Sequence, residues 1–270
     1  MTDEEKYFFD LTGYIIVKNA LNPEEVSALN SVLDERWNDL EEIQESLARG
    51  AKNLVGEFRR KGLGLPMDAA GEHGEACRSV LAHPKINPYL NEIIGKGFRL
   101  DHGHSFIVQE KDCEGHTFHG STGPAFDPNQ YYIVRNGKMN SGLTVVTWQL
   151  ADVNPGDGGF TLVPGSHKGN FPVPDAVRRY EIFQDRFEPM VMKAGDAVIF
   201  SETVLHGTLP WTSDNPRRSI LARYTAANLA YVPHTRHEAL LDEIGAELNE
   251  KQKAVLEPPY HTRLNRPLID

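Results

Sequence analysis

The stretch KAGDAVIFSETVLHGTLPWTSDNPRRS, from Lys193 to Ser219, decides the fold. Its two apolar runs, 197–200 and 204–209, are separated by a short turn, and this pattern predicts two neighbouring β-strands. His206 lies inside the second run, and a pair of arginines follows it. A histidine in such a strand is either a core imidazole that bonds to the backbone or a site residue. The rest of the chain decides between these two interpretations.

The composition is typical of a soluble globular protein, with 40% hydrophobic and 24% charged residues in a chain of 270. The net charge of -10 disfavours nucleic acid and anionic membranes as partners, although local arginines can still bind a small anion. The acidic N-terminus lacks the basic and apolar pattern of a leader, and no apolar run approaches the roughly 18 residues of a membrane span. We therefore expect a cytoplasmic location. Cys77 and Cys113 belong to no CxxC pair and are expected to be reduced thiols.

Helix signals dominate the first part of the chain. Asn22 and Pro23 begin a helix whose apolar side chains recur every three or four residues to about Ala48. A β-branched strand is expected before this helix, a long loop after it, and three further helices later in the chain. These elements are predicted at 14–17 (strand), 51–75 (loop), and 76–82, 88–94 and 237–256 (helices).

From Phe98 to Thr225 the pattern changes to short strands separated by turns. Such strands, preceded by helices, predict a mainly β fold of the α+β class, a sandwich or open barrel that helices cover on one face. The length suits one large domain. The predicted strands are 98–109, 143–150, 160–163, 191–192, 197–200, 204–209 and 219–225.

The histidines offer several candidate metal ligands, but no HExxH motif occurs. His102 and His104 are two residues apart on a predicted strand, so they share one face, whereas Asp101 points to the other. That pair alone does not define a metal site. His119 and His206 become more informative together, because the first follows a predicted strand and the second lies within one.

Five segments in a fixed order resemble the phytanoyl-CoA dioxygenase family of Fe(II)/2-oxoglutarate-dependent oxygenases, over residues 8 to about 226. The segments are FFDLTGYIIVKNAL (8–21), GGFTLVPGSHK (158–168), KAGDAVIF (193–200), LHG (205–207) and RRS (217–219). The resemblance implies a double-stranded β-helix, a jelly-roll or cupin-like barrel covered by N-terminal helices. It implies one oxygenase domain over 1–270, with a helical part at about 1–95, the barrel at about 96–228, and a C-terminal helix and tail at about 229–270.

The resemblance also implies the site. Fe(II) would be held by a proximal histidine, an acid two residues after it, and a distal histidine, with 2-oxoglutarate as cosubstrate. Matched by position to the family motif, His119 would be the proximal and His206 the distal ligand of the iron, and both would be catalytic residues. Arg217 would bind the far carboxylate of 2-oxoglutarate, since a guanidinium suits a bidentate contact. Ser219, two residues on and on the same face, would donate to that carboxylate, whereas Arg218 would point away into solvent.

Some further residues are candidates for contacts with ligands. Trp148 and Gln149 alternate along one strand, so only one of them faces the barrel interior. We expect Trp148 to pack under the long helix and Gln149 to contact 2-oxoglutarate or substrate. Loops at barrel mouths commonly bind substrate, which makes other polar residues candidates: His116, Tyr131, Tyr132 and Arg135. His167 is expected to stabilise a turn.

The chain departs from the family at one position, because it reads His119-Gly120-Ser121 where an acid should follow the histidine. Three interpretations stay open. The third ligand position is left to water or to chloride, as in halogenases of the superfamily. Alternatively, Glu202 or Asp127 supplies a carboxylate. Finally, the iron site is degenerate.

We expect an oxidoreductase that hydroxylates an unactivated C–H bond of a small-molecule substrate. One alternative is a halogenase that uses the same cofactors, and another is a small-molecule-binding protein on the same barrel without catalysis.

Overall fold

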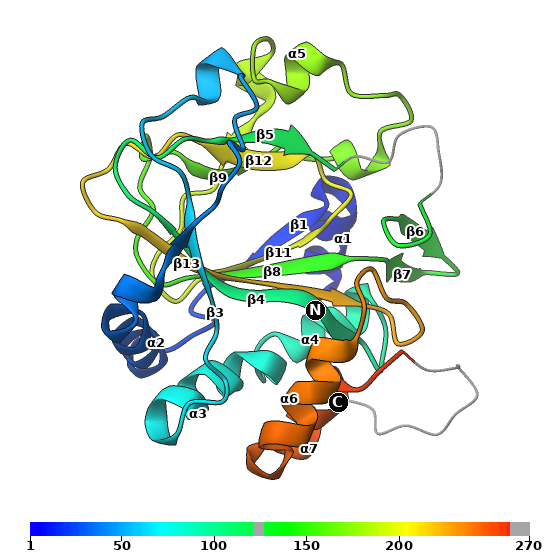
Figure 1. Cartoon of the computed structure of the whole chain (residues 1–270). Coiled ribbons are helices and arrows are strands. Elements are labelled where there is room, and N and C mark those ends of the chain that lie inside the picture. Colours follow the sequence, from blue (N-terminus) through cyan, green and yellow to red (C-terminus); the bar gives the residue numbers. More distant parts are fainter. Residues whose placement is uncertain (121–126, 260–270) are drawn as a thin grey trace.

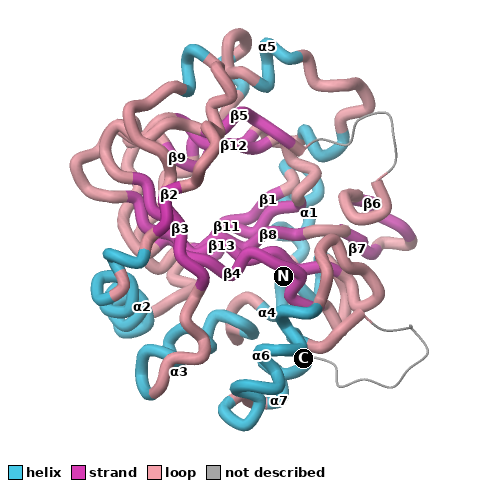
Figure 2. Tube along the Cα trace, viewed as in Figure 1, coloured by secondary structure: helices cyan, strands magenta, loops and turns pink. Residues whose placement is uncertain are grey.

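The protein is described by a computed structural model of residues 1–120 and 127–259. Two antiparallel sheets face each other across the core, with the smaller sheet above the larger one in Figures 1 and 2. The strand order is β1-β11-β8-β13-β4-β3-β2 in the larger sheet and β10-β9-β12-β5 in the smaller one. A separate hairpin, β6-β7, lies beside them. This two-sheet arrangement confirms the predicted mainly β fold with helices.

The larger sheet contains β1 (Tyr14–Val17), β2 (Glu41–Glu42), β3 (Lys61–Gly64), β4 (Arg99–Gln109), β8 (Thr144–Gln149), β11 (Ala197–Ser201) and β13 (Arg217–Thr225). The smaller sheet contains β5 (His116–His119), β9 (Gly159–Leu162), β10 (Glu188–Pro189) and β12 (His206–Leu209), and the hairpin contains β6 (Tyr132–Arg135) and β7 (Lys138–Ser141). The helices are α1 (Asp3–Thr12), α2 (Pro23–Glu35), α3 (Gly71–Ser79), α4 (Asn87–Ile93), α5 (Asp175–Arg178), α6 (Thr235–Ile244) and α7 (Glu250–Leu256). Short 3-10 turns occur at Trp37–Asp39, Lys52–Leu54, Val80–Ala82, Ser166–Lys168, Gln184–Arg186 and Gly245–Glu247.

The alternation of β8 divides the core into two layers. Trp148 is buried among apolar side chains of the helical layer, including Leu29 and Leu33 of α2, as predicted. Val145, on the opposite face of β8, packs against Phe160 of β9 and other residues between the two sheets. Because successive strand residues point to opposite faces, the helices cover one face of the larger sheet and the other face is left for the site.

The prediction of a helix to Ala48 was wrong, because α2 ends at Glu35. Its start is as expected, since Asn22 and Glu25 form a capping box and Pro23 is the first helical residue. Beyond it, residues 41–42 pair with β3 and extend the larger sheet. The helical spacing of apolar residues therefore continues past the helix itself, where long-range strand pairing overrides local propensity.

Other boundaries also differ from the predictions. The strand expected at 191–192 is only an isolated bridge between Met192 and Val153, and β10 forms at 188–189 instead. The loop expected at 51–75 contains β3, and Tyr132 and Arg135, expected in a loop at the barrel mouth, form β6. The final helix is divided into α6 and α7 by a 3-10 turn, after which the side chain of Asn249 caps α7. Within the described chain, no helix has the length and apolar character needed to cross a membrane.

Candidate metal and cosubstrate site

His119 and His206 face each other across the smaller sheet. His119 ends β5 and pairs with His206, which begins β12, and their ring centroids are 4.2 Å apart. In both residues, Nδ1 contacts the carbonyl oxygen two positions earlier, at 3.1 Å for Thr117 and 2.7 Å for Val204. A carbonyl can only accept, so Nδ1 carries the hydrogen and Nε2 keeps its lone pair. Both imidazoles are therefore oriented to act as ligands through Nε2.

Glu202 supplies a carboxylate to the same place from the turn between β11 and β12. Its side chain is only 8% exposed, and Oε1 lies 3.7 Å from Nε2 of His206. One ligand atom from each of His119, Glu202 and His206 can be chosen so that all lie within 4.8 Å of one another. Among the described residues, no other group of three potential ligands meets in this way. Two imidazoles and one carboxylate form the donor set of many Fe(II) oxygenases, so these residues fit that metal.

The two substitute carboxylates considered from the sequence are placed differently. Glu202 joins the two histidines, whereas Asp127 accepts a hydrogen bond from the backbone N–H of Asn129 at 2.8 Å and shapes a turn. Ser121, at the position where the family has its acid, lies outside the described residues.

Gly120 allows β5 to approach the turn that carries Glu202. Its φ is +85°, a conformation that favours glycine, and a Cβ there would lie 2.4 Å from the carbonyl oxygen of Val204 and 2.6 Å from that of Glu202. Any larger residue would push the end of β5 away from this turn. The glycine between His119 and Ser121 thus helps to bring Glu202 close to the proximal histidine.

Burial keeps the histidines of the site neutral. It lowers the pKa of His119 to about 3, with a further contribution from His206, and it lowers the pKa of His206 to about 4. His116, whose ring centroid is 4.4 Å from that of His119, has its pKa lowered to about 2 by burial and then by His119. Neutral imidazole is the form that binds metals, so His119 and His206 can bind a metal without first losing a proton.

A cavity of about 240 Å³ lies between the sheets and connects the histidines with Arg217 and Ser219 of β13. Arg217 is buried, and one of its terminal nitrogens donates to Oε1 of Gln109 at 3.0 Å, whereas its Nε has no partner in the described chain. Burial, and then the positive charge of Arg60, lowers the pKa of Arg217 to about 10. A buried guanidinium without a carboxylate partner is suited to bind an anion that enters the cavity.

The predicted shared face of Arg217 and Ser219 is present, since both line this cavity. Arg218 points the other way, as predicted, but it is not simply solvated. It forms an ion pair with Asp34 at 2.7 Å and lies over the ring of Trp37, 5.0 Å from the centroid. Arg218 therefore fastens β13 to the last turn of α2 and to Trp37 just after it.

Gln149 is fully buried and pairs with Ser219 across β8 and β13. Both atoms of its amide lack partners in the described part of the chain, which fits a polar contact with a ligand. Its side chain does not, however, form part of the cavity wall.

The mouth residues proposed from the sequence have mixed positions. His116 lines the cavity. Tyr132 donates a hydrogen bond to Asp10 at 2.9 Å and so holds the hairpin against α1, and Arg135 is exposed on β6. His167 bonds through Nε2 to the carbonyl oxygen of Asp10 at 3.0 Å, which stabilises its turn against α1.

Arg60, Thr208 and Arg223 also line the cavity and were not predicted. Arg223 could have been found, because it continues the alternation of Arg217 and Ser219 along β13. Arg60 comes from the segment just before β3, and nothing in its local sequence marks it as a site residue.

Comparisons with known proteins identify the family of the chain. The family model described as phytanoyl-CoA dioxygenase (PhyH) matches residues 9–219. The chain belongs to this family of 2-oxoglutarate oxygenases. No curated protein sequence matches the chain significantly.

Solved structures show the same fold at low sequence identity. HygX from Streptomyces hygroscopicus, with nickel, 2-oxoglutarate and hygromycin B bound, has a TM-score of 0.69 and 19% identity over 86% of this chain and 90% of its own. The carbocyclase SnoK from nogalamycin biosynthesis has a TM-score of 0.64 and 18% identity over 100% and 97%. The epimerase SnoN from the same biosynthesis has a TM-score of 0.62 and 20% identity over 86% and 85%. SnoK and SnoN share this fold but are described as a carbocyclase and an epimerase, so the fold alone does not define the reaction.

Proposed function

We propose that the chain is an Fe(II)- and 2-oxoglutarate-dependent oxygenase that hydroxylates an unactivated C–H bond of a small organic molecule. One observation carries the proposal: potential ligand atoms of His119, Glu202 and His206 lie within 4.8 Å of one another beside a cavity that ends at a buried arginine. Family membership supports the choice of Fe(II) and 2-oxoglutarate. HygX, described with iron or with nickel and 2-oxoglutarate bound, supports it further.

In this proposal the two Nε2 atoms and the Glu202 carboxylate hold the metal. The Nδ1 hydrogen bonds to the carbonyls of Thr117 and Val204 keep both rings in the ligating tautomer. When bound, Fe(II) with 2-oxoglutarate and dioxygen would supply the oxidative chemistry that attacks a C–H bond. The role of the chain is to bind and orient both partners at this point.

The far carboxylate of 2-oxoglutarate would bind Arg217, with Ser219 as a second donor. Ser219 Oγ now lies 3.4 Å from the carbonyl oxygen of Ile107, a long contact that leaves its hydroxyl able to turn toward the cavity. Gln149 pairs with Ser219 across the two strands, and its amide would offer a further polar contact to 2-oxoglutarate. Phe160, Phe200 and Leu221 complete the cavity wall with apolar surface, which limits the access of water to the reacting atoms.

Glu202 also favours hydroxylation over the halogenase alternative. A halogenase needs a ligand position that no carboxylate takes, and here a carboxylate lies beside His206. The same three-residue donor set disfavours the degenerate site and the non-catalytic alternative, since a pure binding protein has no need to bury two neutral imidazoles around a carboxylate.

Anaerobic titration with Fe(II) and 2-oxoglutarate tests the proposal. We expect a metal-to-ligand charge-transfer band for the native chain, its loss in Glu202→Ala, and its retention in Asp127→Asn, which removes the other candidate carboxylate. In air, with a substrate, succinate should form together with a hydroxylated product, and added chloride should leave the product unchanged. Absence of the band in the native chain would contradict the proposal. A chlorinated product would show that the reaction is halogenation and not hydroxylation.

A rescue experiment tests the place of the third ligand. If Glu202 is that ligand, Ser121→Asp in the Glu202→Ala background should restore the band, because it returns the acid of the family motif two residues after His119. Equal bands in Glu202→Ala and the native chain would show that Glu202 does not bind the metal.

A further inference from the structure

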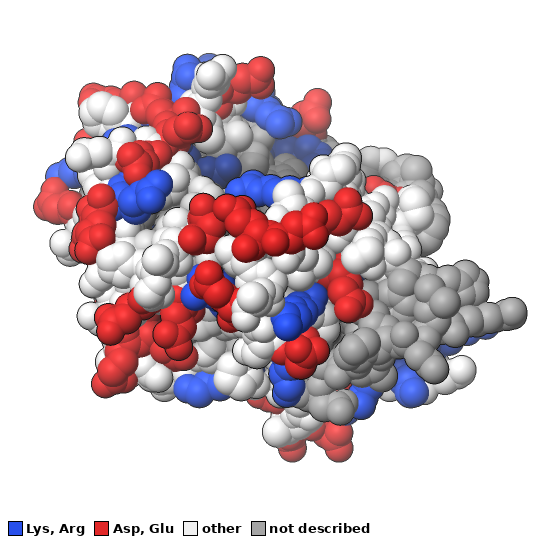
Figure 3. All heavy atoms as spheres, turned by 60° about the horizontal axis from the view of Figure 1, so that its bottom comes forward, with Lys and Arg blue, Asp and Glu red and all other residues white. Residues whose placement is uncertain are grey.

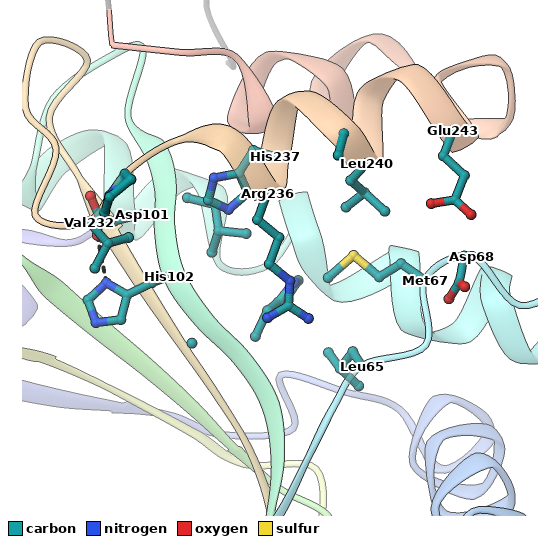
Figure 4. A pocket seen from close by; sticks show the side chains of 15 residues that line it. Leu65, Met67, Asp68, Asp101, His102, Val232, Arg236, His237, Leu240 and Glu243 are labelled. Carbon is teal, nitrogen blue, oxygen red and sulfur yellow. Dashed lines mark hydrogen bonds and ion pairs between the residues drawn. The ribbon is translucent and has the colours of Figure 1, made fainter.

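A second and larger cavity, of about 460 Å³, lies between the start of β4 and α6 (Figure 4). Its walls come from the start of β4, the segment between β3 and α3, and α6. Helix α6 lies beyond residue 219, where the family match ends. This pocket is therefore built partly from a segment that is not part of the family pattern, and its volume suits a small organic ligand.

His104 contributes a buried polar group without a partner to this pocket. It is 7% exposed, lines the cavity, and neither ring nitrogen has a hydrogen-bond partner in the described chain. Burial, followed by the charges of His237 and Arg236, lowers its pKa to about 3, so the ring is neutral and carries one N–H. A buried donor without an acceptor is costly unless a ligand or water completes it.

Arg236 supplies the charge. Figure 4 shows its side chain extending from α6 into the middle of the pocket. None of the described residues forms an ion pair or hydrogen bond with it, although a terminal nitrogen lies close to Gly64. The first turn of α6 also borders the pocket, and no side chain caps it, so the helix dipole adds positive potential there. His104, Arg236 and this helix end together favour an anionic group.

The rest of the pocket limits what else the ligand can carry. Leu65, Met67 and Leu240 provide an apolar surface next to Arg236. Asp68 and Glu243 lie together at the end away from His102 (Figure 4). Acidic side chains also predominate on the outer face over these helices (Figure 3). A second negative group would therefore be repelled, which disfavours polyphosphate-bearing ligands.

The pocket meets the proposed active site at Gly103, which lines both cavities. Gly103 has a φ of +98°, and a Cβ there would lie 3.3 Å from a terminal nitrogen of Arg223. Arg223 in turn contacts Glu202. The larger pocket is thus connected to the metal-binding residues through Gly103, Arg223 and Glu202.

We propose that this pocket binds the substrate, and that the substrate is an organic monoanion with an apolar body whose acid group is held by Arg236 and His104. The claim that the ligand is the substrate rests on the proposed function, whereas binding itself does not.

Binding is tested in metal-free protein with the fluorescent monoanion 8-anilinonaphthalene-1-sulfonate. We expect Arg236→Gln to raise its Kd about tenfold, because a charge-assisted contact is lost. His104→Phe should also weaken binding while it preserves or increases stability, since it removes two unpaired buried nitrogens. Arg186→Gln, a charge-matched change at an exposed residue outside the pocket, should leave the Kd unchanged. 4-Phenylbutyrate should displace the dye, and its neutral amide should not.

No dye binding, an unchanged Kd in Arg236→Gln, or equal displacement by the amide would overturn the anion site. The link to catalysis has its own measurement, in which 4-phenylbutyrate is added to the anaerobic complex with Fe(II) and 2-oxoglutarate. A shift of the charge-transfer band in the native chain, lost in Arg236→Gln, supports the substrate assignment. An unchanged band overturns that assignment alone, and absence of any band counts against the proposed function rather than the pocket.

Discussion

Nε of Arg223 lies 3.4 Å from Oε2 of Glu202, so this arginine contacts the carboxylate oxygen that does not face His206. The two oxygens of one buried carboxylate thus have separate neighbours, a guanidinium on one side and an imidazole on the other. Arg223 also lines the cavity of the proposed active site. It is therefore placed to orient Glu202 and to connect the metal-binding residues with the barrel mouth.

Replacing Arg223 should weaken metal binding without removing any ligand. In Arg223→Gln the Glu202 carboxylate loses the partner that fixes its orientation, and we expect the Kd for Fe(II) to rise about tenfold. Anaerobic metal titration measures this change. Arg218→Gln is the matched control, because Arg218 lies on the opposite face of the same strand. Equal affinity in the native chain and Arg223→Gln would show that Glu202 is positioned without Arg223.

Arg217 should govern binding of the cosubstrate rather than the metal. Among the described residues its buried guanidinium has no carboxylate partner, so in Arg217→Gln we expect the affinity for 2-oxoglutarate to fall about 10- to 100-fold, with Fe(II) affinity unchanged. Titration of the iron-loaded protein with 2-oxoglutarate separates the two quantities. A loss of iron affinity equal to that of 2-oxoglutarate would mean that the substitution disturbs the whole site.

Arg60 should affect stability and cosubstrate binding in opposite directions. Burial, and then repulsion from Arg223, lowers its pKa, and its own charge lowers that of Arg217. Arg60→Gln removes this repulsion, so we expect a higher melting temperature for the ligand-free protein and a higher Kd for 2-oxoglutarate. Thermal melts with and without 2-oxoglutarate measure both effects. A lower melting temperature of the ligand-free variant would show that packing of the Arg60 side chain outweighs the repulsion.

Acid should destabilise the metal-free protein through its buried histidines. Burial lowers the pKa of His104 to about 3 and that of His167 to about 4, whereas an unfolded histidine titrates near about 6.5. Above that value both states are neutral. Between that value and the folded-state pKa, the unfolded chain binds a proton that the folded chain does not, so the free energy of unfolding falls by about 1.4 kcal/mol per pH unit for each such histidine. Urea denaturation at several pH values measures this pH dependence of the free energy of unfolding. In His104→Phe the dependence should correspond to one proton fewer than in the native chain. Identical dependences would contradict the claim that folding keeps His104 neutral.

The family resemblance was sufficient to predict that His119, His206 and Arg217 belong to one site, and all three line one cavity. His206, Arg217 and Ser219 belong to two short segments with fixed spacing, and strand alternation correctly placed Arg217 and Ser219 on the same face. Glu202 could be weighed from the sequence because it lies in the turn just before the strand of His206. The direction of its side chain could not, because that depends on how closely β5 approaches the turn.

Arg60, which sequence reasoning missed, reaches the site through long-range strand pairing. Arg60 is near the site because β3 joins the edge of β4, and no local pattern records that pairing. The same cause explains why the helix predicted to reach Ala48 was too long, since residues 41–42 pair with β3 instead of continuing the helix. Helical or strand periodicity reports which face of an element is apolar, whereas the partner of an edge strand is set by contacts distant in the sequence.

Gly120 should be needed for the site as well as for stability, and the chain contains a control that separates the two. Gly137, in the turn between β6 and β7, has a φ of +70° and open space where a Cβ would be, whereas Gly120 has a φ of +85° and the carbonyls of Val204 and Glu202 in that space. Gly137→Ala therefore measures the backbone cost alone, about 1 kcal/mol. Gly120→Ala should lose more free energy of unfolding in urea, since β5 must also move away from the turn of Glu202, and its Kd for Fe(II) should rise. Equal stabilities of the two variants, with native metal affinity in both, would show that the approach of β5 to this turn has no part in forming the site.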